Sequence, residues 1–433
     1  MKGFDRIIGY ASIKDELMRI ADALQNKDAY RALGVDMPNG LLLHGVPGVG
    51  KSNMAMALIE ASGWNAFICR KIKSDGEFVD MIRDTFRRAA ENEPSIVLLD
   101  DMDKFSNSDD MPRDCDEYVA VQACIDETRA REVFVLATAN SIRQLPSSLK
   151  RVGRFDRIIE IDTPTGEDAV QIVAHYLKSK NLETDLDART IAEIMQNCSC
   201  AELETVINEA GLLAGYQRAL GITMDHIIEA CLKVVHEVPT SFLKDRTPID
   251  LRRSLESARI IWHEAGHAVL EEILYPGNVA LVFARCCEDG RYGFTKYKYD
   301  RSNRDVRDIK GNIIAALGGR AAVEEKLRLL DTGALRDLEM AFENADSLIT
   351  EHCCEGLHLS CYLDNRPSEG LKESQEQAEA VLVEYLYQKA KEILHANLGF
   401  LDAVANELAK KGVLVASDIA RIREGCVITP AML

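Results

Sequence analysis

Apolar residues form three short runs in the first 140 residues of the chain. The runs cover residues 40–44, 95–100 and 133–138, and stretches with helical spacing of apolar residues separate them. Strands that are apolar on both faces are typical of a parallel sheet that helices cover on both sides. We therefore predict an α/β domain over residues 1–165, in which strands alternate with amphipathic helices.

The hydrophobic pattern becomes helical throughout after the third run. Residues 166–238 predict a small helical lid, and a polar link that contains proline follows them. Such a link is typical of a domain boundary. The remainder, residues 239–433, predicts a mainly α-helical domain with a short sheet around residues 279–283 and 292–295.

Composition and charge restrict the class of protein. The chain has 433 residues, of which 47% are hydrophobic and 28% are charged, and its net charge is -18. These values are globular, and the acidic balance gives no global attraction to nucleic acid or to an anionic membrane. No apolar run approaches the ~20 residues that a transmembrane helix needs. We expect a soluble protein with no integral membrane segment and no nucleic-acid partner.

Twelve cysteines are many, but their spacing is irregular. A long chain with this pattern indicates a reducing, cytoplasmic compartment rather than a disulfide framework. One cluster is a candidate for a second metal site, namely His352, Cys353, Cys354, His358 and Cys361. We do not predict a site there, because the usual C-x-x-C pairing is missing.

A glycine-rich loop follows the first predicted strand directly. It matches G-x-x-x-x-G-K-[ST] in full, with Gly45, Val46, Pro47, Gly48, Val49, Gly50, Lys51 and Ser52. In this motif glycines let backbone N–H groups surround phosphates, the lysine contacts the β- and γ-phosphates, and the hydroxyl ligates Mg²⁺. We predict a site for ATP and Mg²⁺.

Polar residues at the ends of the other two strands extend this site. Asp100 can hold Mg²⁺ through its water shell, and Asp101 can polarise the attacking water. Asp101 is one methylene shorter than the glutamate common at this position. Asn140 can orient the water or sense the γ-phosphate, although a strand-end turn residue is the alternative. We expect Asp103 to be a solvated residue at a helix start.

Two arginines follow the last predicted strand. Arg151 and Arg154 lie in the segment 149–156, on a loop beyond the sheet. Such residues can reach a neighbouring subunit's nucleotide as trans-acting arginine fingers. Ordinary surface arginines are the alternative.

The third predicted domain contains the motif H-E-x-x-H. His263 and His267 are four residues apart, so a helix places both imidazoles on one face at metal-binding separation. Glu264 can polarise a zinc-bound water, whose pKa the metal lowers toward neutral. A catalytic zinc site needs a third protein ligand. The spacing leaves four carboxylates open, namely Asp331, Asp337, Glu339 and Glu343.

In this order, the motifs resemble those of FtsH-type ATP-dependent zinc metalloproteases, which are AAA+ proteins. Further similar segments are residues 4–9, 153–157, 316–325 and 332–341. The resemblance implies that Ile8 and Gly9 lie near the adenine pocket. It implies that Arg151 and Arg154 belong to the arginine-finger segment. It also implies that Asp337 is the third zinc ligand.

The resemblance implies an α/β AAA+ P-loop domain with a helical lid, followed by a mainly α-helical zinc metalloprotease domain. It also implies a homohexamer that binds Zn²⁺, Mg²⁺ and ATP. In such a machine an ATPase ring unfolds protein substrates and pulls them through a central pore into a proteolytic chamber.

Three departures from the family pattern keep other interpretations open. The family's membrane-spanning N-terminus has no counterpart, as expected for a natural soluble member or a trimmed chain. Asp101 replaces the usual glutamate, and residues 70–79 are shorter than the family's pore-loop region. Phe78 is the nearest candidate for gripping the substrate, with a helix-core residue as the alternative. The two other hypotheses are an AAA+ remodelling factor with vestigial proteolysis and a zinc peptidase limited to unfolded peptides.

Overall fold

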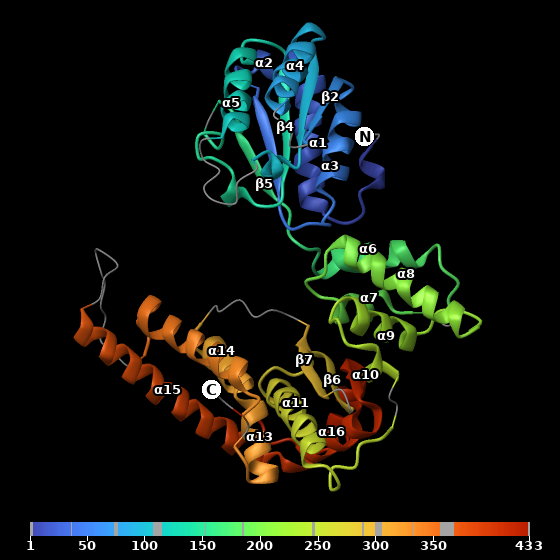
Figure 1. The fold of residues 1–433 in the computed structure, drawn as a ribbon, viewed down its shortest axis with the longest axis vertical. Helices are drawn as coiled ribbons and strands as arrows, with labels where there is room; N and C mark the ends of the chain where they lie inside the picture. Colours follow the sequence, from blue (N-terminus) through green and yellow to red (C-terminus); the bar gives the residue numbers. More distant parts are fainter. Residues whose placement is uncertain are drawn as a thin grey trace. The chain divides into compact units, whose positions relative to one another are not determined.

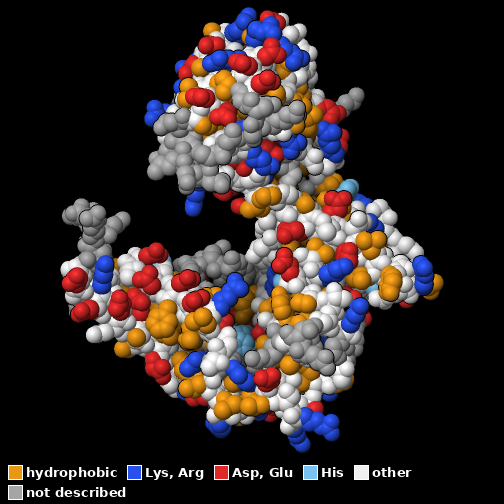
Figure 2. All heavy atoms as spheres, viewed as in Figure 1, with side chains coloured by type: hydrophobic (Ala, Val, Ile, Leu, Met, Phe, Trp, Pro, Cys, Tyr) orange, Lys and Arg blue, Asp and Glu red, His pale blue; other side chains and the backbone are white. Residues whose placement is uncertain are grey.

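The protein is described from a computed structural model, in which the chain forms two compact units, Met1–Val235 and His236–Leu433 (Figure 1). The structure describes residues 3–35, 37–72, 77–106, 115–151, 153–183, 186–244, 247–287, 290–298, 305–330, 332–355 and 368–431. Figure 2 shows acidic and basic side chains interspersed on the visible face of both units.

The first unit is built on a five-stranded parallel sheet with the order β2-β3-β4-β1-β5. Its strands are β1 (Gly40–His44), β2 (Asn65–Arg70), β3 (Ser95–Asp100), β4 (Val133–Ala139) and β5 (Arg157–Glu160). The three central strands are buried along their whole length, as their apolar runs require. The predicted α/β class is confirmed.

Helices cover both faces of this sheet because successive strand side chains point to opposite faces. Leu42 belongs to the core beneath α4 and α5, which lie on one face, while α1 and α3 pack together on the other (Figure 1). The helices of the layer are α1 (Ala11–Gln25), α2 (Lys27–Ala32), α3 (Lys51–Ser62), α4 (Phe78–Glu91) and α5 (Asp116–Thr128). Short 3₁₀ turns are η1 (Phe4–Arg6), η2 (Met102–Lys104) and η4 (Ile142–Gln144).

Four helices, which we call the lid, complete the first unit. They are α6 (Gly166–Leu177), α7 (Ala188–Ile194), α8 (Cys200–Tyr216) and α9 (Met224–Val234). Helix α8 starts at a capping box in which Ser199 and Glu202 satisfy each other's backbone N–H groups. At this end the Ala201 N–H donates to the Gly48 carbonyl over 3.1 Å, so the lid contacts the phosphate loop directly.

The second unit is mainly α-helical, as predicted. Its helices are α10 (Thr240–Lys244), α11 (Leu255–Leu274), α12 (Val306–Ala316), α13 (Gly318–Leu327), α14 (Leu335–Asp346), the π-helix η5 (Ser347–Glu351), α15 (Glu369–Ala396), α16 (Leu398–Lys411) and α17 (Ala416–Glu424). A small antiparallel sheet with the order β7-β6-β8 completes it, made of β6 (Val279–Cys287), β7 (Gly290–Tyr297) and β8 (Val413–Val415).

Helix α11 is the centre of the second unit. Every residue from Ile261 to Ile273 is buried, because the sheet packs on one side and α13 and α16 pack on others. A helix that other elements cover on all sides is part of the core. The polar side chains of His263, Glu264 and His267 on α11 therefore lie in fixed surroundings.

The pore-loop candidate Phe78 is a buried residue of α4. Phe78 is 5% exposed, and its ring centroid lies 4.7 Å from that of Phe105, which supports the helix-core interpretation. Residues 73–76 of the same segment lie outside the described residues, as do His358 and Cys361 of the second candidate metal site.

Among the described helices, none combines the length and apolar character needed to cross a bilayer.

Candidate nucleotide and metal sites

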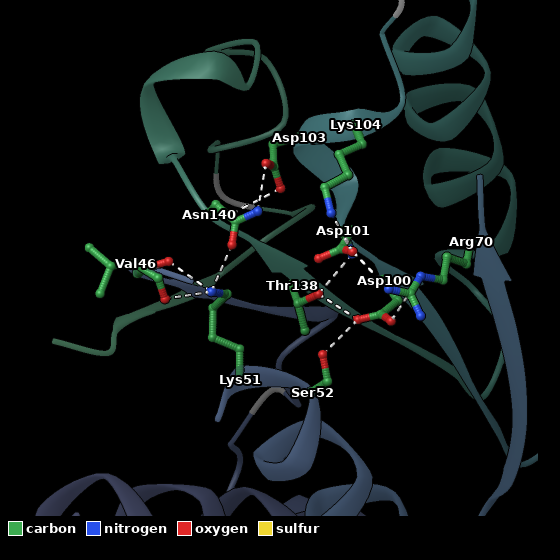
Figure 3. A network of polar contacts seen from close by, with 11 residues as sticks. Val46, Lys51, Ser52, Arg70, Asp100, Asp101, Asp103, Lys104, Thr138 and Asn140 are labelled. Atoms are coloured by element: carbon green, nitrogen blue, oxygen red, sulfur yellow. Dashed lines mark hydrogen bonds and ion pairs between the residues drawn. The ribbon is translucent and has the colours of Figure 1, made fainter. Parts of the chain in front are cut away.

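The glycine-rich loop joins β1 to α3 and wraps around the Lys51 ammonium group (Figure 3). Lys51 Nζ donates to the carbonyls of Gly45 and Val46 over 2.8 and 3.0 Å, and to Asn140 Oδ1 over 3.0 Å. Gly48 and Gly50 have φ values of 83° and 96°, which side chains with a Cβ rarely adopt. A buried ammonium held only by oxygen acceptors fits a site for phosphate oxygens.

A hydroxyl and a carboxylate lie beside this loop at the carboxyl edge of the sheet. Ser52 Oγ donates to Asp100 Oδ1 over 3.1 Å, and Thr138 Oγ1 donates to the same oxygen over 2.8 Å. Oxygen ligands of this kind are the ones that Mg²⁺ prefers, usually with retained waters. The donor set therefore fits the predicted metal.

Asp101 is bound on both sides by cations. Its carboxylate accepts from Arg70 Nη2 over 3.0 Å and from Lys104 Nζ over 2.9 Å. Burial opposes ionisation, but these two donors outweigh it and hold the pKa of Asp101 below its usual range. The carboxylate is thus ionised and engaged, rather than directed freely toward solvent.

Asn140 is oriented by Asp103. The Asn140 backbone N–H and side-chain amide donate to the two oxygens of Asp103 over 2.9 and 3.0 Å, which leaves Oδ1 toward Lys51. The expectation of a solvated Asp103 is wrong, because this carboxylate is partly buried against a strand end 37 residues away. Sequence spacing carries no sign of that contact.

A small cavity of about 110 Å³ lies next to the phosphate loop, between η1, α3 and the lid. Ile8 lines it, while Gly9 lines a neighbouring pocket. The lining also includes Tyr10, His175, Tyr176 and Cys200. Sequence reasoning missed these four residues, since three of them come from the lid and meet the others only in the folded unit. A partly apolar cavity beside the phosphate loop, lined by aromatic as well as aliphatic side chains, fits a nucleobase.

The two predicted finger residues are held differently. Arg154 Nη2 pairs with Asp126 over 2.7 Å, and its Nη1 donates to Gln122 over 2.8 Å, which ties it to α5. Arg151 is exposed on the same loop. The structure thus leaves the Arg151 side chain in solvent and engages that of Arg154.

Three ligand atoms converge in the second unit. His263 Nε2 and His267 Nε2 are 3.1 Å apart, and Asp337 Oδ2 of α14 lies 3.2 and 3.4 Å from them. His267 Nδ1 lies 2.8 Å from the Ala315 carbonyl, which fixes the ring and turns Nε2 toward the other two groups. Two imidazoles and one carboxylate are a donor set for catalytic zinc. Asp331, one rival for the third position, lies outside the described residues.

Glu264 lies beside these ligands and is 4% exposed. Thr295 Oγ1 of β7 donates to Glu264 Oε2 over 2.9 Å, and burial raises the pKa of the carboxyl group. The site opens into a cleft of about 650 Å³ between α11, β7 and α14. A carboxylate held next to a metal-type cluster at the floor of a cleft is suited to proton transfer.

Glycines let α13 pack closely against α11, the helix that carries His263 and His267. A Cβ on Gly319 would lie 2.6 Å from both imidazoles, and one on Gly266 would lie 2.3 Å from the Gly318 carbonyl. Sequence reasoning singled out this segment only by its resemblance to the family. The close packing shows that the glycines make room for the two histidines.

Two family models match the chain one after the other, in the same order as the nucleotide site and the metal site. The sequence model of the ATPase family associated with various cellular activities (AAA) matches residues 41–163, and that of Peptidase family M41 matches residues 252–422. ATP-dependent zinc metalloprotease FtsH 2 of Symbiobacterium thermophilum is 30% identical, over 97% of this chain and 74% of the relative. FtsH of Halothermothrix orenii is 26% identical, over 94% of this chain and 68% of the relative.

FtsH of Mycoplasma pneumoniae is 29% identical, over 99% of this chain and 63% of the relative. The three relatives are similar along almost the whole chain, and the resemblance inferred from the motifs is confirmed. An AAA match followed by an M41 match, with a relative of 30% identity across both, shows that the chain belongs to the FtsH family of ATP-dependent zinc metalloproteases.

Proposed function

We propose that this chain degrades proteins at the site of His263, His267 and Asp337, with ATP hydrolysis at the phosphate loop driving substrate unfolding and translocation. The observation that carries the proposal is the convergence of the three ligand atoms, all within 4.8 Å of one another, beside the buried Glu264. Family membership supports the coupling of the two activities.

In the protease site, His263, His267 and Asp337 would hold zinc, and Glu264 would be the general base. Bound zinc supplies Lewis-acid activation of water and of the scissile carbonyl. Glu264 would accept a proton from the attacking water and donate it to the leaving amine, while Thr295 holds the carboxylate in place. The low exposure of Glu264 keeps competing bulk water away from the proton.

The substrate lies along β7 in an extended conformation. This strand is at the edge of the sheet, and Gly293, Phe294 and Thr295 line the cleft beside the ligand helix. An edge strand can add a further strand through main-chain hydrogen bonds, which bind peptides of many sequences. This mode suits an enzyme that cleaves many bonds of one unfolded chain.

In the ATPase site, the loop from Gly45 to Ser52 binds the phosphates, and Lys51 contacts the β- and γ-phosphates. Ser52 and Asp100 hold Mg²⁺, while Asp101 and Asn140 act on the attacking water. Ile8 and Gly9 lie at the adenine end of the site. We assign residues 1–165 to the ATPase core, 166–238 to the lid and 239–433 to the protease domain.

The active assembly is a homohexamer, in which Arg151 and Arg154 reach the nucleotide of a neighbouring copy. The exposure of Arg151 on a loop beyond the sheet supports a contact in trans. The protein acts in the cytoplasm. The irregular spacing of the twelve cysteines in a long chain supports a reducing compartment.

Glu264→Gln tests the protease assignment. The variant should bind zinc as the parent does but lose cleavage of an unstructured fluorogenic peptide by at least ~10²-fold, because the general base is gone while the ligands remain. Zinc content, measured by atomic absorption, and peptide cleavage are read in parallel. Near-parental cleavage at full zinc content would sink the assignment.

A further inference from the structure

Arg70 is the last residue of β2, and its side chain points into the nucleotide site from the sheet edge (Figure 3). The parallel register pairs Arg70 with Asp100 on β3, which places the two side chains at the same carboxyl edge. Arg70 Nη2 lies 3.0 Å from Asp101 Oδ2, and Arg70 Nε lies 3.7 Å from Asp100 Oδ2. One guanidinium group therefore spans both carboxylates of the site.

The charges of the site are balanced without nucleotide. Its cations are Lys51, Arg70 and Lys104, and its carboxylates are Asp100, Asp101 and Asp103 (Figure 3). Magnesium ATP brings net negative charge into this balanced set. A cation that can turn from a carboxylate to a phosphate oxygen offsets the added charge at little cost, because it exchanges one charge-assisted hydrogen bond for another.

Arg70 is the cation best placed for such an exchange. Lys51 is 6% exposed and held by three acceptors, so it is already committed to the phosphate loop. Lys104 is three residues from Asp101 on the same turn and pairs with it locally. The Arg70 side chain is 58% exposed and comes from a different strand, and its planar fork matches phosphate geometry.

We propose that Arg70 contacts the γ-phosphate of ATP bound to its own subunit, and that it leaves Asp101 to do so. In this arrangement the γ-phosphate competes with Asp101 for one guanidinium group, so Asp101 is released from one of its two cations only when a triphosphate is bound. Arg70 then distinguishes nucleoside triphosphate from diphosphate. The inference rests on the proposed nucleotide site.

The test is a comparison of nucleotide affinities in the full-length chain with Mg²⁺ present. A non-hydrolysable β,γ-imido analogue of ATP and ADP each displace a fluorescent nucleotide from the parent and from Arg70→Ala. We expect the variant to lose about tenfold to 100-fold in affinity for the analogue, as for one hydrogen bond to a charged group, with ADP affinity unchanged. Arg70→Lys should lose less, since it retains the charge but not the fork.

Arg87→Ala is the matched control. Arg87 is 60% exposed and pairs with Asp84 and Glu91 on α4, so its removal changes the net charge equally without touching the nucleotide site. Both affinities should stay at the parental value. Thermal denaturation of each variant checks that the fold is intact.

A double-mutant cycle with Asp101→Asn tests the exchange of partners. With Arg70 present, Asp101→Asn should tighten analogue binding more than it does in the Arg70→Ala background, because removal of the competing carboxylate frees the guanidinium group. Equal effects in the two backgrounds would overturn the proposed exchange.

Other outcomes separate this inference from the proposed function. If Arg70→Ala lowers the rate of ATP hydrolysis but leaves the ratio of analogue to ADP affinity unchanged, Arg70 only positions Asp101 and the γ-phosphate contact is wrong. If Lys51→Ala binds the analogue as tightly as the parent, the nucleotide site itself is wrong, and the inference falls with it.

Discussion

At the scale of single residues, position on a helix separates the candidates for the third zinc ligand. The spacing left both Asp337 and Glu339 as candidates for the third ligand. The Asp337 carboxylate points toward the two imidazoles, while Glu339 is exposed. The interactions with His263 and His267 outweigh burial and hold the pKa of Asp337 well below its usual range. Side-chain direction on α14 thus carries information that the sequence pattern lacks.

Asp337→Ala should reduce zinc affinity by at least ~10²-fold, because loss of groups that merely support a ligand already costs about tenfold to 100-fold. Peptide cleavage should fall with the zinc content. Glu339→Ala, on the same helix and with the same charge change, should keep both. Zinc titration of the two purified variants is the measurement, and full occupancy in Asp337→Ala would move the third ligand elsewhere.

Alanine substitutions of Arg151 and Arg154 should differ in their effect on the stability of the fold. Arg151→Ala should slow ATP hydrolysis on the order of 10³-fold at unchanged nucleotide affinity, as for other trans-acting arginines. Arg154→Ala should slow hydrolysis and also lower the melting temperature slightly, because it loses its contacts with Asp126 and Gln122. Arg143→Ala, exposed on a neighbouring turn, is the control. Parental hydrolysis rates in both variants would contradict the finger role.

The residues of the phosphate loop were predictable because one contiguous segment contains them all. Arg70, Asp103 and Thr138 were not predicted as members of the site, since they reach it only through the register of β2, β3 and β4. A rule that examines every residue at the carboxyl end of a predicted parallel strand would have found Thr138, but not Arg70, because β2 was not among the predicted strands.

At the scale of elements, strands were predictable according to their burial. The apolar runs of β1 and β3 coincide with the structural strands, while β2 and β5 lie at the sheet edges with one buried residue each. The apolar runs of these strands are short, with four residues in β2 (66–69) and two in β5 (Ile158 and Ile159). Strand β8 has only three residues between two helices, too few for a periodic pattern.

The packing of α13 against the two imidazoles depends on Gly319. Gly319→Ala should disturb both imidazoles, because its Cβ would lie 2.6 Å from each ring, and should therefore lower zinc affinity and peptide cleavage together. Gly399→Ala, on helix α16 with nothing within 4 Å of its Cβ, should keep both and raise the melting temperature slightly. Unchanged zinc affinity in Gly319→Ala would show that α13 can move away without cost to the site.

At the scale of the whole molecule, the order of the two sites along one chain is the central feature. The phosphate loop lies in the unit Met1–Val235, and the zinc-type cluster lies in the unit His236–Leu433. In the proposed mechanism the zinc chemistry needs no nucleotide, whereas a stably folded substrate has to be unfolded before its backbone can lie along β7. Both domain types were predictable from their motifs, but the coupling between them is a property of the assembly.

The most direct test is degradation of a stably folded, tagged protein, followed by gel electrophoresis with zinc present. The parent should degrade it with ATP and fail with the β,γ-imido analogue. Lys51→Ala should fail with ATP yet still cleave an unstructured peptide, and Glu264→Gln should fail with both substrates. Degradation of the folded protein by Lys51→Ala at the parental rate, or without any nucleotide, would contradict the account.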